Sequence, residues 1–289
     1  MRLGSGSFAT VFVGEGRGCV VLKQVHDPTR NAELDKEHTD LRLLHEVCRS
    51  DDALFVFPRP FGFYRDYLGF ARETGMADPG PSGPLHSSHA LYVMQRMWPV
   101  PLGIASHIRD EFFPEGQNVT PVLARLYLGR ARSSNSSSSS RFFCSENFPL
   151  DAERIERLGL PSRAIAEGMG QTLGRINFRA GRDGRDVEFV LCGDPDNPLS
   201  KRPGYACIDF NQMRPHGDDA AVIVDSIVTN DPYYPRPPSP HWSSFAAAYL
   251  REAEEADADA AADAAADRPP QMTRHTNTAR AVLAQLHPT

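Results

Sequence analysis

The sequence lacks the features that mark secreted, membrane-spanning and zinc-finger proteins. Its cysteines are odd in number and widely scattered, and no two form a C-x-x-C pair: Cys19, Cys48, Cys144, Cys192 and Cys207. This pattern indicates neither a disulfide framework nor a zinc knuckle, so no zinc is expected. No basic stretch leads into an apolar N-terminal segment, and no apolar run approaches the ~20 residues that span a bilayer. We expect no membrane association and a reducing, cytoplasmic or nuclear location.

Strongly basic segments are also absent. The formal net charge is -6 over 289 residues, and residues 251–268 contribute -5 of it through seven acids and two arginines. The rest of the chain is therefore close to neutral, without a patch of lysine, arginine and aromatic residues suited to phosphate backbones, and no nucleic-acid binding is expected. With 40% apolar residues, a chain of this length can bury the core of one large domain or of two lobes.

Four irregular stretches divide the chain, rich in proline and glycine or in serine: 78–84, 133–140, 194–204 and 234–240. We expect each to be a surface loop. The serine tract 133–140 has no apolar area to offset its chain entropy, so it is expected to be a disordered insert; a phosphorylated regulatory insert is the alternative.

Hydrophobic periodicity predicts the elements between these loops. A hairpin over 11–22 precedes a helix over 32–47, and a second amphipathic helix covers 162–178. Residues 222–228 are compatible with helix or strand, and 242–255 predict a closing helix. Short strands are expected at 55–57, 61–64, 90–94, 187–191 and 205–210.

The N-terminal segment resembles the first half of a protein kinase. Residues 4–11 resemble the glycine-rich loop, in which backbone N–H groups at Gly4 and Gly6 close over nucleotide phosphates; a plain hairpin turn is the alternative. Lys23 ends a β-branched run that resembles the strand whose lysine neutralises phosphates, and Glu37 lies where the kinase helix supplies its partner. A surface lysine and a solvated glutamate are the simpler alternative.

Residues 91–97 resemble a kinase hinge, the strand end that binds adenine. Met94 would be the gatekeeper, and Met97 would offer backbone to the adenine edge. An ordinary buried strand explains the same residues. Only three residues precede Gly4, fewer than a kinase first strand has, so an incomplete upper lobe is expected.

The downstream carboxylates follow the kinase order. Asp183 matches the catalytic aspartate, Glu188 lies where kinases have a metal-binding asparagine, and Asp209 matches the magnesium aspartate. Carboxylate oxygens suit a hard cation such as magnesium. Ala9, Gly181, Glu188 and Asn211 depart from the kinase pattern, which weakens the case for phosphotransfer. Asp186 is open between a turn residue and a metal ligand.

Beyond these signals, the chain resembles a fungal protein family of unknown function, loosely labelled zinc-finger-like, along most of its length. That resemblance implies no settled activity, and its zinc-finger label matches no ligand spacing in this sequence. The segments that carry it are 124–130, 147–150, 183–191, 209–211 and 230–235. For 230–235, a proline-stiffened segment docked by its aromatic side chains is the simpler interpretation, and peptide recognition the other.

The sequence thus predicts an α+β, protein-kinase-like fold of two lobes. A small β-rich N-lobe is expected over 1–98, a larger and mainly helical C-lobe over 99–256, and an acidic, partly disordered tail over 257–289. The predicted function is that of an atypical kinase-like domain that binds ATP and Mg²⁺, with Asp183 orienting the acceptor. The alternative is a non-catalytic, pseudokinase-like module that holds a protein partner.

Overall fold

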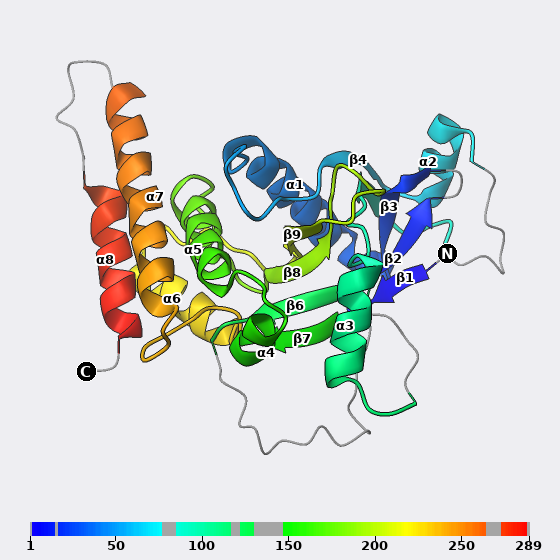
Figure 1. Ribbon diagram of the computed structural model, residues 1–289. Coiled ribbons are helices and arrows are strands. Elements are labelled where there is room, and N and C mark those ends of the chain that lie inside the picture. The colour runs from blue at the N-terminus through cyan, green and yellow to red at the C-terminus, as the bar shows by residue number, and fades with distance from the viewer. Residues whose placement is uncertain are drawn as a thin grey trace. The chain divides into compact units, whose positions relative to one another are not determined.

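The computed structural model describes residues 2–14, 17–76, 85–116, 122–129, 147–263 and 273–287 (Figure 1). The serine tract, the stretch 78–84 and Cys144 lie outside them. The chain divides into two compact units, Met1–Glu46 with Phe57–Met97 as unit 1, and Val47–Val56 with Trp98–Thr289 as unit 2. Each unit has its own sheet and helices, so the α+β class is confirmed. The expected boundaries at 98 and 256 stay predictions.

Unit 1 contains a five-stranded antiparallel sheet in the order β1-β2-β3-β5-β4. Its strands are β1 (Arg2–Ser5), β2 (Ala9–Gly14), β3 (Arg17–Val25), β4 (Pro60–Tyr64) and β5 (Leu91–Gln95). The predicted hairpin is formed by β2 and β3, and β1 adds to its edge with Gly4 opposite Val11. A 3-10 turn over Pro28–Arg30 leads from β3 into helix α1 (Asn31–Val47).

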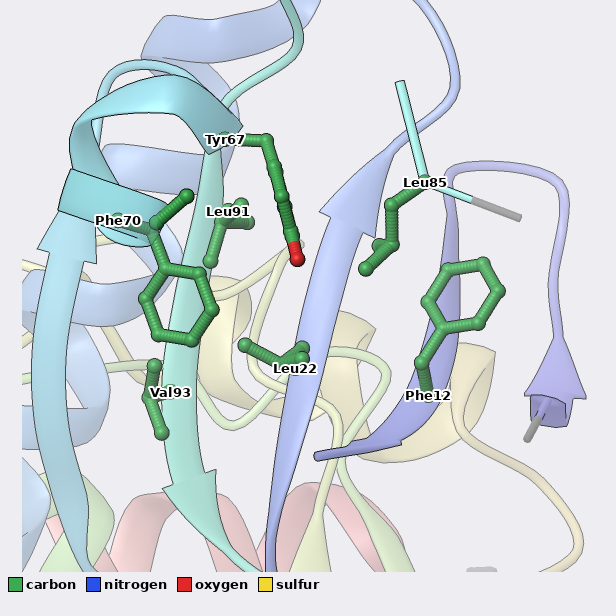
Figure 2. Packing of buried hydrophobic residues seen from close by; sticks show 8 residues of the cluster. Phe12, Leu22, Tyr67, Phe70, Leu85, Leu91 and Val93 are labelled. Carbon is green, nitrogen blue, oxygen red and sulfur yellow. The ribbon is translucent and has the colours of Figure 1, made fainter. Parts of the chain in front are cut away.

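The two faces of this sheet bury different residues because side chains alternate along a strand. On one face, the short helix α2 (Tyr67–Thr74) packs Tyr67 and Phe70 against Leu22 and Leu91, as Figure 2 shows. The Asp66 carboxylate accepts the N–H of Gly69 at 2.7 Å and thereby caps the start of α2. The residue next to Leu22 on β3, Lys23, lies on the other face.

Unit 2 contains a four-stranded mixed sheet in the order β7-β6-β8-β9. These strands are β6 (Leu123–Tyr127), β7 (Asn147–Asp151), β8 (Glu188–Gly193) and β9 (Pro203–Ile208), with β6 and β7 parallel and the other pairs antiparallel. The prediction of a strand over 55–57 is wrong. Val56 makes a single bridge to Ala206, and Phe55 is buried by packing its ring on Phe189 at 4.8 Å between centroids.

Six helices complete the described part of unit 2: α3 (Leu102–Phe112), α4 (Ala152–Arg157), α5 (Ser162–Phe178), α6 (Ala220–Thr229), α7 (Trp242–Asp263) and α8 (Arg274–Leu286). The bounds of α5 are those predicted, and the ambiguous segment 222–228 is helical. The acidic tract continues α7 as far as Asp263. No helix was predicted at α8, which lies beside α7 (Figure 1) with the Asp257 carboxylate accepting the backbone N–H groups of His275 and Thr276.

Helices α5 and α7 approach closely because α5 presents glycines to α7. A Cβ atom at Gly170 would lie 2.2 Å from the carbonyl oxygen of Phe245, and one at Gly174 would lie 2.7 Å from the Cβ of Glu252. The backbone of α7 therefore lies so close to Gly170 that no side chain would fit there. None of the helices in the described part of the chain has both the length and the hydropathy to cross a membrane.

Gly170→Ala should therefore destabilise the protein, whereas Gly103→Ala on α3 should not. The added methyl group at position 170 meets backbone, which we expect to lower the free energy of unfolding by about 1–3 kcal/mol. A Cβ at Gly103 meets nothing within 4 Å, so the same exchange should leave stability unchanged or raise it by up to ~1 kcal/mol. Urea denaturation followed by circular dichroism measures both, and equal stabilities would contradict the close approach of α5 and α7.

Candidate functional site

The buried ion pair of unit 1 joins β3 to α1. Lys23 Nζ donates to Glu37 Oε1 at 2.6 Å, and only 9% of Lys23 and none of Glu37 is exposed. Glu37 lies on the apolar stripe of α1 with Leu34, Leu41 and Leu44, which are fully buried. The helical period thus places the carboxylate inside the core, where the lysine supplies its counter-charge. The pairing predicted from the sequence is confirmed.

The turn between β1 and β2 has open space above its glycines. The N–H of Gly6 donates to the carbonyl of Ala9 at 3.0 Å, and a Cβ atom at Gly4 or Gly6 would meet nothing within 4 Å. Neither glycine has a positive φ angle among the described backbone values. Phe8, at the end of the turn, is buried, and the Lys23 ammonium lies 5.8 Å from its ring centroid. Packing within unit 1 therefore does not require glycine at these two positions.

The expected hinge residues lie at the end of β5. Met94 pairs with Val21 of β3 and with Pro60 of β4, so it lies within the sheet. Met97 follows two residues after the end of β5 and is the last residue of unit 1. Adenine binding by this segment stays a prediction.

Asp183 lies in the loop between α5 and β8 and is fully buried, with 0% of its surface exposed. Its Oδ1 accepts the backbone N–H of Arg185 at 3.1 Å and that of Arg214 at 2.9 Å. Its own N–H donates to the carbonyl of Arg214 at 2.8 Å, and Oδ2 lies 3.8 Å from Arg185 Nε. These bonds join the α5–β8 loop to the segment after β9. They give Asp183 a structural task, and its catalytic role stays a prediction.

The same loop is supported by residues that the sequence analysis did not single out. The Asn177 amide donates to the carbonyl of Arg182 at 2.7 Å and accepts the Tyr249 hydroxyl at 2.8 Å. His216, which is buried, bonds through Nε2 to the carbonyl of Asn177 at 2.7 Å. Gly181, where kinases have histidine, has a φ of 63°, a backbone conformation that favours glycine. Asn177 and His216 thus support the loop between α5 and β8.

Glu188, the first residue of β8, forms a two-point ion pair with Arg125 of β6. Arg125 Nε donates to Oε2 at 3.1 Å, and Nη2 lies 2.5 Å from Oε1. Burial raises the pKa of Glu188 to about 7; the Arg125 guanidinium opposes this, and the charges of Asp209 and Asp186 add to it. Three carboxylates and one guanidinium therefore form a charged cluster, which we call the acid cluster: Asp186, Glu188, Asp209 and Arg125.

The two aspartates of the acid cluster lie on turns next to the β8–β9 hairpin. Glu188 is opposite Ile208 in the ladder, so Asp209 follows directly after the paired residue. Asp186 and Asp209 have φ angles of 64° and 63°, which few residues other than glycine adopt. Gln212 donates to Asp186 Oδ2 at 2.6 Å. Left-handed aspartates of this kind occur preferentially at functional sites, which marks the hairpin end as a candidate site.

The structure thus brings together Glu188 and Asp209 within unit 2, and Lys23 and Glu37 within unit 1. Arg125 was missed. Its segment was noted only as part of a family resemblance, and alternation along β6 could have placed Arg125 opposite the buried face of Ala124 and Leu126. Its partner, 63 residues further along the chain, had no local signal.

The acid cluster fits magnesium poorly as it is arranged. Magnesium takes oxygen ligands, but both oxygens of Glu188 already face the Arg125 guanidinium, which is permanently charged. A metal ion at Glu188 would have to displace that pair. In the described ranges, no three histidine, cysteine, aspartate or glutamate side chains are grouped so as to hold a metal ion. Magnesium binding by Asp209 and Glu188 stays a prediction.

A family model described as DUF3669, zinc finger protein, matches residues 207–261, and no curated protein matches the chain. The matched segment contains Asp209, α6 and most of α7. The segment contains one cysteine and two histidines, and each has another environment. Cys207 is fully buried on β9, His216 bonds to the Asn177 carbonyl, and His241 lies 3.6 Å from Glu156. The chain is similar to this family over less than half of its length.

Asp183→Ala should unfold more easily than wild type. The substitution removes the acceptor of two backbone N–H groups inside the core, which we expect to lower the free energy of unfolding by about 2–4 kcal/mol. Asp183→Asn keeps an acceptor oxygen and should lose less. Asp196→Ala, at an exposed position, serves as the control in the same urea denaturation. Wild-type stability of Asp183→Ala would show that the carboxylate has no structural task.

The charge on Glu188 should titrate near neutral pH. A carboxyl ¹³C NMR titration should show a midpoint at about 7, lowered by up to ~1 unit in Asp209→Asn and raised in Arg125→Gln. Because this folded-state pKa lies above the usual 4.5, the stability that Glu188 contributes is complete below pH 4.5 and is lost as the pH rises to about 7. A wild-type midpoint near 4.5 would show that burial does not control this carboxyl group.

Proposed function

We propose that the chain is a kinase-like, two-lobed domain that binds a nucleotide, with unit 1 as the smaller lobe. The observation that carries the proposal is the buried pair of Lys23 and Glu37. A buried ion pair adds little net stability to a fold, because desolvation offsets its attraction. Stability alone therefore does not account for the burial of this pair. An ammonium group held in place by a carboxylate is suited to bind phosphate oxygens.

The glycine turn supports the same function. The open space at Gly4 and Gly6 allows a ligand to approach the backbone of the β1–β2 turn, as a phosphate group requires. Along the chain the order is glycine turn, lysine strand and glutamate helix, which is the order of the kinase resemblance. Met97 would add a backbone contact to adenine.

The second candidate is a non-catalytic, pseudokinase-like module that holds a protein partner. The specific observation in its favour is the complete burial of Asp183, whose Oδ1 is already bonded to two backbone N–H groups. A carboxylate so placed is a poor acceptor for a substrate proton, because a catalytic base must reach the reacting hydroxyl. We therefore place nucleotide binding ahead of phosphotransfer.

Other parts of the proposal rest on sequence alone. They are membership of a fungal family of unknown function, ATP as the nucleotide, a protein rather than a nucleic-acid partner, and a cytoplasmic or nuclear location. The near-neutral body of the chain and its scattered cysteines support the last two.

A thermal-shift titration of the full chain with ATP tests the proposal. A ligand that binds only the folded state adds about 2.7 kcal/mol at 100 times its Kd, so the melting midpoint should rise. The double variant Lys23→Met/Glu37→Gln should lose this rise; both partners are changed because a single change would leave a buried charge unpaired. Lys201→Met removes a lysine from an exposed position and should respond like wild type.

The outcomes of this titration separate the candidates. An unchanged wild-type midpoint, with or without magnesium, would reject nucleotide binding and leave the interaction module. A rise that survives in the double variant would show that nucleotide binds elsewhere than at Lys23. If the rise depends on Lys23 but no phosphate leaves ATP labelled at the γ position, the domain binds nucleotide without transferring phosphate.

A further inference from the structure

A side chain from the glycine turn covers the ammonium group of Lys23. Lys23 Nζ lies 5.8 Å from the Phe8 ring centroid, within the ~6 Å reach of a cation–π contact, and 2.6 Å from Glu37 Oε1. Only 11% of the Lys23 side chain and 6% of Phe8 are exposed. An anionic ligand that binds this ammonium therefore has to displace a neighbour of Lys23.

Phe8 is the neighbour that can move. The carboxylate of Glu37 lies inside the core on the same stripe of α1 as fully buried leucines, so its displacement would open the core of unit 1. Phe8 instead ends a turn that contains only glycine and serine, residues 4–7. A Cβ atom at Gly4 or Gly6 would meet nothing within 4 Å, so the turn has open space beside it.

The ends of the turn are fixed by hydrogen bonds. The Thr10 hydroxyl lies 2.9 Å from that of Ser5 and 2.7 Å from His26 Nε2, and Thr10 is buried. The N–H of His26 donates to the carbonyl of Phe8 at 3.1 Å. Movement is thus confined to Gly6, Ser7 and the ring of Phe8.

A second cation holds the Phe8 ring in place. Arg30 Cζ lies 4.5 Å from the ring centroid, and Arg30 donates to both carboxylate oxygens of Glu33 at 2.9 and 2.6 Å. The ring therefore contacts two cations, Lys23 on β3 and Arg30 before α1. A cation–π contact at a partly exposed site shifts an equilibrium about two- to fivefold, so these contacts favour the covered state without locking it.

The covered state does not explain the two glycines. Neither Gly4 nor Gly6 has a positive φ angle, and packing leaves room for a side chain at both positions. A second conformation of the turn, one that glycine reaches without strain and other residues do not, would explain them.

We infer that Phe8 is a lid on Lys23. In the closed form, which the structure shows, the ring covers the ammonium; in the open form, which the glycines permit, the ammonium is accessible to an anionic ligand. Arg30 stabilises the closed form. One consequence rests on the nucleotide binding proposed above: a phosphate group has to open the lid, so the observed affinity for nucleotide is lower than that of the open form.

Acetylation of lysine side chains in the full chain, measured by mass spectrometry, tests the lid without any nucleotide. The sequence contains only three lysines, and the other two, Lys36 and Lys201, are exposed and serve as internal references. In wild type, Lys23 should react at least about tenfold more slowly than either, because its reaction requires local opening.

Two variants should change the acetylation rate of Lys23 in opposite directions. Phe8→Ala removes the lid and should raise the rate about fivefold or more, whereas Phe61→Ala, at an exposed phenylalanine of β4, should leave it unchanged. Gly6→Ala should lower the rate about two- to fivefold, because alanine restricts the turn to the closed form. The added Cβ meets nothing within 4 Å, so Gly6→Ala folds and decides even if Phe8→Ala does not.

Each comparison can overturn the inference. A wild-type Lys23 that reacts as fast as Lys36 would show that its ammonium is not covered. An unchanged rate in folded Phe8→Ala would show that the ring is not the cover. An unchanged rate in Gly6→Ala would show that the turn has no open form that depends on glycine.

The thermal-shift titration with ATP tests the consequence for nucleotide separately. Phe8→Ala should respond at an ATP concentration about two- to fivefold lower than wild type does, because no lid has to open. A weaker response would show that Phe8 belongs to the binding site and is not a lid. No response in wild type or variant would reject the proposed function and leave the acetylation result standing.

Discussion

The hydrogen bonds of one buried carboxylate hold together the part of unit 2 on which the acid cluster depends. Asp183 bonds through Oδ1 to the N–H groups of Arg185 and Arg214, and its carbonyl accepts the Ser226 hydroxyl at 2.5 Å. These contacts join the loop after α5, the segment after β9 and helix α6 at a single residue. A buried carboxylate must be bonded where it lies, since its desolvation is otherwise uncompensated. The positions of Asp186 and Asp209, three residues after Asp183 and five before Arg214, are therefore constrained from both sides.

A second layer of contacts supports that arrangement from the helices. Asn177 at the end of α5 links Tyr249 of α7 to the loop carbonyl of Arg182, and His216 bonds to the carbonyl of Asn177. Two of these hydrogen bonds run from a side chain to backbone and the third joins two side chains, and together they form a directional network around the loop. The glycines of α5 contribute indirectly, because the close approach of α7 at Gly170 brings Tyr249 within reach of Asn177. The helical packing and the acid cluster are thus parts of one arrangement.

The sequence predicted the structural features that depend on residues close together in the chain. The period of 3.6 located α5 within its observed bounds, and the order of lysine strand and glutamate helix predicted the contact of Lys23 with Glu37. The pairing of β6 with β7 and β8 was not predictable, because strand pairing across long loops leaves no local signal, and Arg125 was missed with it. Helix α8 was missed because its sequence is mostly polar and its start depends on Asp257, some twenty residues earlier. The expected strand at 55–57 failed because buried aromatic side chains can also come from a loop.

Three buried ion pairs in the described part of the chain differ in their surroundings. Arg175 and Glu252, at 2.9 Å, join α5 to α7 in a helix interface that already packs closely, so their pairing follows from the packing of that interface. The pair of Lys23 with Glu37 lies near Phe8, which ends a turn whose glycines Gly4 and Gly6 have open space. Asp186 and Asp209, whose charges act on Glu188, have left-handed backbone. Since a buried pair contributes little net stability, its position beside open or strained backbone is the more informative property. By this criterion the pair of Lys23 with Glu37 and the pair of Arg125 with Glu188 differ from that of Arg175 with Glu252, whose position follows from helix packing.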